Sequence, residues 1–359
     1  MSFSLLNANI LSSLFYIVVA ILVLMLMVTI HELGHYLVAR KLGFKINEFA
    51  IGFGKILWSK INKRGEKISI RLFPLGGMCV FEGEDEELKN NPLAFNNQKP
   101  WKRLLVQFAG GFFNIVSALI FAFIFLVSYG YDIMRVSAVP VDSQNYGVIQ
   151  TGDIVYKVNG TDIYFANDNR LSDLLSRATH DETTEVILTI KRDGEFIEVP
   201  VLFKAVISTV EGVSTTSYML NISFENYPQP FFEALGNTIP FVFGWAWVIL
   251  KFFWLLITFR VSLTEVGGPI STIGMIADVS SKSFANFMLL LPLIAINLGV
   301  FNLIPFPALD GMRMLFTEIE WVRGKPLNRN VEAYIHFGGF VFLIIFVFAV
   351  DIIKLFVWG

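Results

Sequence analysis

Two histidines and a glutamate stand close together in an otherwise apolar stretch, as His31-Glu32-Leu33-Gly34-His35. On a helix, residues four positions apart share one face and lie about 6 Å apart along the axis. Both imidazoles can then reach a single zinc ion. Glu32 lies about 100° around the helix, where it can act as a base toward a water molecule beside the metal. The pattern predicts a hydrolytic zinc site.

The surroundings of this motif strengthen the prediction. It ends an apolar segment that begins at about Leu14, and the first 30 residues contain no Lys, Arg, Asp or Glu. A chance match or a pair of core histidines is the alternative interpretation. Ionisable groups near hydrocarbon are costly unless they serve a function, which favours the metal site. A basic n-region and a small-residue cleavage site are not evident, so we expect a retained membrane helix rather than a signal peptide.

A catalytic zinc usually has three protein ligands, so a further ligand is needed. Asp310 is the best candidate, because it follows another apolar block in the segment 302–311, Asn-Leu-Ile-Pro-Phe-Pro-Ala-Leu-Asp-Gly. The same segment could instead be a helix-ending turn at the membrane surface, since Pro and Gly both favour one. His336 is a weaker alternative and more typical of an interfacial residue. His180 lies in the predicted soluble domain, away from the apolar blocks, so we do not expect it to be a ligand.

Composition indicates a membrane protein. The 359 residues are 54% hydrophobic, and the apolar residues come in blocks. The net charge of −2 gives no indication of a nucleic-acid partner, and the single cysteine, Cys79, excludes an intramolecular disulfide. Four of these blocks are long enough to span a membrane: about 14–31, 104–129, 287–309 and 334–357. For a fifth block, about 238–259, it is ambiguous whether the segment crosses the membrane.

The distribution of positive charge predicts the topology. The stretch between the first two blocks contains 13 Lys and Arg residues, which places it in the cytoplasm and His31 toward that side. If 238–259 crosses the membrane, Asp310 reaches the wrong leaflet; if it does not, Asp310 arrives at the depth of the histidines. We therefore expect four transmembrane helices, with 238–259 interfacial or re-entrant, although hydropathy alone favours a span. Interfacial side chains share one helical face in that block, at Trp247, Lys251 and Trp254.

Two polar regions separate the apolar blocks. Within 66–82, the residues 67–72 and 78–81 predict two short strands around a turn, hence a small hairpin. The region 132–205 predicts a small α/β domain, with a short strand within 147–160, a helix at 170–178, and strands at 184–190 and 195–201. The chain thus divides into two membrane helices with the hairpin (1–131), a soluble domain (132–205), a linker with a membrane-associated helix (206–285) and two last membrane helices (286–359).

In combination these segments resemble the site-2 protease family, in the bacterial branch that performs regulated intramembrane proteolysis. The segments that carry the resemblance are 31–35, 49–54, 73–77, 109–114, 267–270 and 302–311. The resemblance implies zinc held by His31, His35 and Asp310, with Glu32 as catalytic base. It also implies that Asn302 holds the substrate near the metal, assisted by Asn297. The family's usual Gly-Pro in the second helix is replaced here by Gly110-Gly111.

The resemblance extends to the soluble domain and the hairpin. Residues 132–205 are similar to a circularly permuted PDZ domain, with turns at 152–153 and 159–160; such domains take a peptide C-terminus by β-augmentation or act as size filters. An inert spacer is the alternative.

The hairpin would pair with an unwound substrate helix. The implied location is the bacterial cytoplasmic membrane with this domain outside, and the implied substrates are single-pass membrane proteins already cut once outside, such as anti-sigma factors or remnant signal peptides.

Two other classes of function fit parts of the pattern. A catalytically inactive membrane adaptor would bind peptides through the soluble domain, but it would not need Glu32, His31, His35 and Asp310 together. An ion transporter would need further charges near the membrane midplane, and the apolar blocks contain few.

Overall fold

The computed structural model describes residues 3–84, 91–131, 133–163, 171–180, 185–210, 213–261 and 267–358. The chain forms two compact units, one comprising Met1–Phe121 with Ile249–Gly359 and the other Ala122–Val248.

Among the described residues, five helices are long and apolar enough to cross a membrane, including the ambiguous block. They are α1 (Phe3–Leu42), α2 (Pro100–Ser128), α4 (Phe231–Ile257), α6 (Phe284–Leu303) and α8 (Arg329–Trp358). The four predicted spans therefore form helices, with two corrections to their ends.

The first correction concerns α1, which continues through the motif to Leu42 instead of ending at His31. Its last turns are held by packing, because Tyr36 and Ala39 are buried against Phe44 and Phe81. The second concerns α6, which ends at Leu303 and not near 309. Proline lacks the helical N–H and restricts the residue before it, so 305 and 307 cannot continue the helix.

Glycines allow the membrane helices of the first unit to approach closely. A Cβ added to Gly34 of α1 would lie 2.9 Å from the carbonyl carbon of Ala109 on α2. A Cβ on Gly299 of α6 would lie 3.0 Å from the carbonyl oxygen of Gly111. Small residues at such crossings bring backbones together, as in other membrane bundles. Two shorter helices, α5 (Pro269–Lys282) and α7 (Asp310–Arg323), complete this helical group, and α5 packs on α1 and α6.

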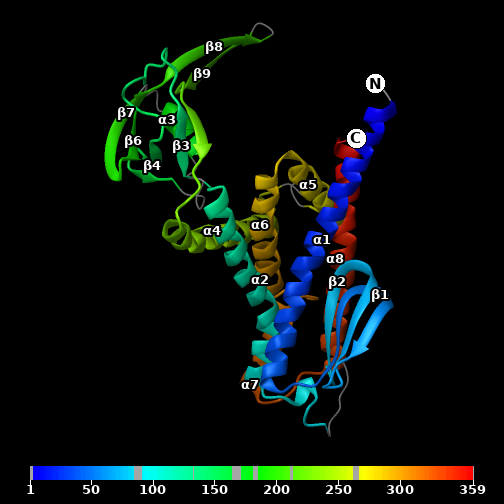
Figure 1. Ribbon diagram of the computed structural model, residues 1–359. Coiled ribbons are helices and arrows are strands. Elements are labelled where there is room, and N and C mark those ends of the chain that lie inside the picture. Colours follow the sequence, from blue (N-terminus) through cyan, green and yellow to red (C-terminus); the bar gives the residue numbers. More distant parts are fainter. Residues whose placement is uncertain are drawn as a thin grey trace. The chain divides into compact units, whose positions relative to one another are not determined.

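A two-stranded sheet, β1 (Ile46–Ile61) and β2 (Lys67–Phe81), lies against α1 (Figure 1). The hairpin predicted within 66–82 is wrong in its pairing: both strand segments belong to β2, but 67–70 and 77–80 pair with 48–51 of β1, which lies between them, and not with each other. One reversal occurs at Asn62–Gly65, between 56–61 and 67–71, where Gly65 has a φ of 81° and its N–H donates to the Asn62 carbonyl. Residues 48–51 and 67–70 run in the same direction, whereas 48–51 and 77–80 run in opposite directions, so the chain reverses again between 70 and 77.

The second unit contains a sheet of antiparallel strands with the spatial order β10-β3-β4-β6-β7, and a short strand β5 beside β4. The predicted strands and helix appear here, with β6 and β7 joined at Asp193-Gly194, both at positive φ. The sheet continues beyond residue 205, because β10 pairs with β3. The elements are β3 (Met134–Ala138), β4 (Ile154–Val158), β5 (Thr161–Asp162), α3 (Leu171–His180), β6 (Glu185–Arg192), β7 (Glu195–Leu202) and β10 (Ser223–Asn226), with a separate ribbon of β8 (Lys204–Val210) and β9 (Val213–Met219).

A buried carboxylate joins α8 to α5 in the first unit. Asp351 is 4% exposed and accepts hydrogen bonds from the backbone N–H groups of Ile270 (2.9 Å) and Ser271 (3.2 Å), and from the Ser271 hydroxyl (2.7 Å). These N–H groups begin α5, where the helix dipole favours a negative charge. Gly268 makes room, because a Cβ there would lie 2.5 Å from a carboxylate oxygen of Asp351.

We predict that Asp351→Ala lowers the free energy of unfolding by about 2 kcal/mol, because it removes a helix cap and leaves buried N–H groups unpaired. Asp351→Asn should cost less, since its amide oxygen still accepts. Thermal unfolding in detergent micelles measures both. Asp278→Ala, at an exposed position of α5, is the control, and an Asp351→Ala protein as stable as this control would contradict the prediction.

Candidate metal centre

His31, His35 and Asp310 meet in the first unit although they are far apart in the sequence. The Oδ2 atom of Asp310 lies 3.0 Å from Nε2 of His31 and 3.1 Å from Nε2 of His35. The two Nε2 atoms are 3.2 Å apart. All three side chains are largely buried, with 18% or less of each exposed. Three ligand atoms thus form a nearly equilateral triangle.

This triangle has the dimensions of a zinc site. In a tetrahedral site with ligand distances of about 2.0–2.1 Å, neighbouring ligand atoms are about 3.3 Å apart. The observed edges are close to that value, and two nitrogens with one carboxylate oxygen make a donor set that zinc accepts. A fourth position stays open for water or substrate, which is the arrangement of catalytic rather than structural zinc.

Hydrogen bonds on the far side of each imidazole orient the ligands. His35 donates from Nδ1 to the Val106 carbonyl at 2.7 Å, so in a neutral imidazole Nε2 is the nitrogen without a proton, and it faces the other two side chains. Nδ1 of His31 lies 3.3 Å from the amide of Asn114, which is fully buried. With its oxygen turned toward His31, this amide accepts the Nδ1–H bond, and its buried Oδ1 gains the partner that it otherwise lacks. The surroundings therefore suit two metal-binding imidazoles.

Asn114 is a functional residue that the sequence analysis missed. It lies in the segment 109–114, to which no chemical role was given. The feature of the sequence that could have identified it is its spacing from Gly110: Asn114 stands four residues later and therefore lies on the same face of α2. A Cβ on Gly110 would lie 2.7 Å from Nε2 of His31, so this glycine gives the imidazoles their space.

Contacts between α2 and α7 hold Asp310, the first residue of α7, in position. Gln107 accepts a hydrogen bond from the Thr317 hydroxyl at 3.1 Å. One turn earlier on α2, Arg103 pairs with Glu320 at 2.6 Å, and both side chains are about 95% buried. Burial would raise the pKa of the Glu320 carboxyl, but the Leu327 N–H and the Arg103 guanidinium outweigh it and hold that pKa below its usual range. The carboxylate therefore stays charged and paired.

The predicted catalytic base, Glu32, and the predicted substrate contacts, Asn302 and Asn297, lie in surroundings that differ from those of the three predicted ligands. Glu32 is partly buried next to β2, where a Cβ on Gly77 would lie 2.9 Å from its Cγ. The Asn302 amide donates to the Leu298 carbonyl within α6, and Asn297 is exposed on the same helix. His336 makes no contact with the cluster. The side chain of His180 lies outside the described residues.

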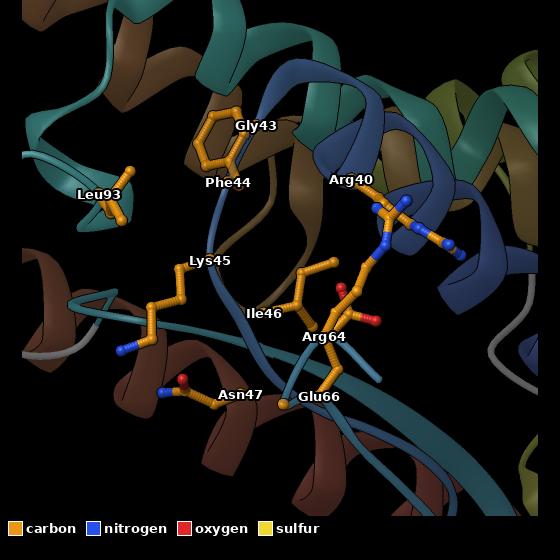
Figure 2. Close-up of a pocket in the computed structure, with 10 residues that line it drawn as sticks. Arg40, Gly43, Phe44, Lys45, Ile46, Asn47, Arg64, Glu66 and Leu93 are labelled. Atoms are coloured by element: carbon orange, nitrogen blue, oxygen red, sulfur yellow. The ribbon is translucent and has the colours of Figure 1, made fainter. Parts of the chain in front are cut away.

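A cavity of about 350 Å³ lies away from the cluster, at the end of α1 (Figure 2). Its lining includes Arg40, Lys45, Arg64 and Glu66. The Glu66 carboxylate is already engaged, because it accepts from the Tyr36 hydroxyl at 2.7 Å. The cavity brings together no set of metal ligands among the described residues, so we place the chemistry at the histidine–aspartate cluster.

We predict that Gly110→Ala weakens zinc binding at least ten-fold, because the new methyl group would occupy the space of the His31 imidazole. Equilibrium competition with a zinc chelator measures the affinity. Gly338→Ala is the matched control, since a Cβ at Gly338 meets nothing within 4 Å. Equal zinc affinity of the two variants would contradict the arrangement.

Known proteins share this organisation along almost the whole chain. The model of peptidase family M50 matches residues 19–346, which include every predicted ligand. The chain is 31% identical to "Putative zinc metalloprotease CPE1693" of Clostridium perfringens, over 91% of this chain and 95% of that protein. Similarly named proteins of Fusobacterium nucleatum (27% identical; 94% and 98% covered) and Helicobacter pylori (29%; 92% and 96%) also match. The chain therefore belongs to peptidase family M50, the zinc-dependent site-2 proteases.

Proposed function

We propose that this protein is an endopeptidase that cuts the transmembrane segments of single-pass membrane proteins, with zinc held by His31, His35 and Asp310. The observation that carries the proposal is that these three side chains meet at distances of 3.0–3.2 Å, and that two of them stand on a helix long and apolar enough to span a bilayer. Polar groups are costly in such a helix unless they serve a function.

Glu32 is the residue that moves protons in this proposal. A bound zinc ion supplies Lewis-acid polarisation and lowers the pKa of a water molecule to about 7. Glu32, next to His31 and against β2, takes a proton from the attacking water and delivers it to the leaving amine nitrogen. Asn302 and Asn297 stay proposed substrate contacts. Asn302 stands on the last turn of α6, eight residues before the start of α7 at Asp310.

We predict that Glu32→Gln abolishes cleavage of a model transmembrane substrate while zinc stays bound, because the amide can neither take nor give the proton. Cleavage is followed by gel mobility of the substrate, and bound zinc by elemental analysis. His35→Leu should lose both the metal and the activity. Full activity of Glu32→Gln would refute the proposed mechanism.

The β1–β2 sheet is the proposed holder of an unwound substrate. A helix shields its own amides, so the scissile segment must be extended before attack, and an exposed strand edge can bind it by β-augmentation. Support comes from Gly77, which brings β2 against Glu32, and from the apolar surface of the sheet. The large apolar side chains exposed there include Phe53, Leu57, Trp58, Ile61, Leu72 and Phe73.

The meeting of His31 with Asp310 supports a topology in which α4 does not cross the membrane. The 13 basic residues after α1 place its His31 end toward the cytoplasm. Asp310 follows α6, so α6 must run toward the same side, and the number of crossings between α2 and α6 must be even. We therefore propose that α4 lies in the outer interface. Its Trp247, Lys251 and Trp254 are all exposed, as an interfacial face requires.

This topology predicts the side of the membrane on which α5 ends. A reporter enzyme that is active only outside the cytoplasm, fused after Lys282, should be active. A fusion after Arg323, on the predicted cytoplasmic side, should be inactive and serves as the control. Reporter activity only after Arg323 would show that α4 crosses.

The second unit provides the proposed filter for substrates. We propose that its sheet is a PDZ-like domain on the extracytoplasmic side that admits proteins already shortened by a first cut, such as truncated anti-sigma factors or remnant signal peptides. The β-sheet topology of this unit supports a small peptide-binding module. The relatives' bacterial sources support the bacterial cytoplasmic membrane as the location.

A further inference from the structure

The backbone just before Asp310 is strained. Ala308 has a φ of 81°, in the left-handed region that residues with a Cβ seldom adopt. Such a conformation is retained only where the surroundings enforce it, and it is found most often at functional sites. Ala308 stands two residues before the proposed ligand, so its conformation sets the direction in which the chain enters α7.

Helix α8 contacts this strained loop at three positions, each about one helical turn from the last. The Ala308 N–H donates to Nδ1 of His336 at 3.1 Å. One turn later, a Cβ on Gly339 would lie 2.8 Å from the carbonyl oxygen of Pro307, so this glycine lets the loop lie directly on the helix. After a further turn, the rings of Phe342 and Phe306 are 6.1 Å apart. The loop is thus fitted to one face of α8.

The hydrogen bond defines the form of His336. Because Nδ1 accepts a hydrogen bond, the proton of the neutral imidazole is on Nε2. The ring also packs edge-to-face on Phe316 of α7, with centroids 5.6 Å apart. His336 therefore contacts both the loop before Asp310 and the helix that begins with it. These contacts explain a membrane-helix histidine that the metal cluster does not use.

We propose that His336 is a positioning residue for the metal centre, which holds Ala308 in its left-handed conformation and so directs the Asp310 carboxylate toward His31 and His35. The inference rests on the proposed role of Asp310 as a ligand. Without the acceptor, Ala308 can relax toward negative φ, and the chain direction at Asp310 changes with it.

The test measures zinc affinity of the full-length protein in detergent, by competition with a chelator. His336→Leu should bind zinc about ten-fold more weakly, because a hydrogen bond that restrains a strained residue is lost. His336→Asn should stay within about three-fold of the wild type, since its side-chain oxygen can take the place of Nδ1. Thermal unfolding of each variant verifies that it is folded.

A second substitution separates backbone positioning from general packing. Glycine adopts a φ of 81° without strain, so Ala308→Gly should restore most of the zinc affinity in the His336→Leu background. Tyr334→Leu, at a 76% exposed position of α8, is the control and should bind zinc as the wild type does.

Three results would overturn the proposal: wild-type affinity in His336→Leu, equal losses in His336→Asn and His336→Leu, or no recovery with Ala308→Gly. Failure of the proposed function gives a different result, because the folded wild-type protein would then bind no zinc at all.

Discussion

The contact of one carboxylate oxygen with two imidazole nitrogens, at 3.0 and 3.1 Å, constrains most of the first unit. The histidines lie within a long helix, and the aspartate begins a short helix that follows a different membrane segment. For them to meet, α1, α2 and α6 must cross closely, and the chain must reverse direction sharply between Leu303 and Asp310. Glycines at the crossings and prolines in the loop meet these two requirements.

The second helix is the element on which this contact is assembled. One face of α2 carries Arg103 and Gln107 toward α7, and then Gly110 and Asn114 toward the histidines. The spacing of four, three and four residues keeps these side chains on one stripe of the helix. A single rigid helix thus fixes Asp310 and the imidazoles relative to one another. Rigid placement of ligands is what a metal site needs for defined geometry.

A feature of this fold or site could be predicted from the sequence where it depends on neighbouring residues, and could not be predicted where it depends on contacts between distant segments. The 31–35 motif and Asp310 could be predicted, because their residue types are rare in apolar segments and the predicted topology puts both at one depth. The end of α1 could not, since its last turns are stabilised by packing against Phe44, just beyond the helix, and against Phe81 of the distant strand β2. The pairing of β2 was missed for a similar reason: the turn at 62–65 lies in a run of charged residues, and the strand that separates 67–70 from 77–80 is 48–51, which comes from an earlier part of the chain. The roles of Asn114 and His336 depend on contacts across helices, which no local pattern encodes.

Several buried charged groups of the first unit occur in combinations whose charges nearly cancel, as their apolar surroundings require. Arg103 and Arg329 face Glu320 and Glu332, which makes two charges of each sign. Asp351 is set against the positive end of α5. A bound zinc ion would balance the two negative charges of Asp310 and Glu32, with both imidazoles neutral. Since an isolated charge is costly in a low-dielectric region, each charged group needs its partner in place when the helices assemble. Metal binding and the packing of α7 onto α2 should therefore stabilise each other, because both keep Asp310 next to the histidines.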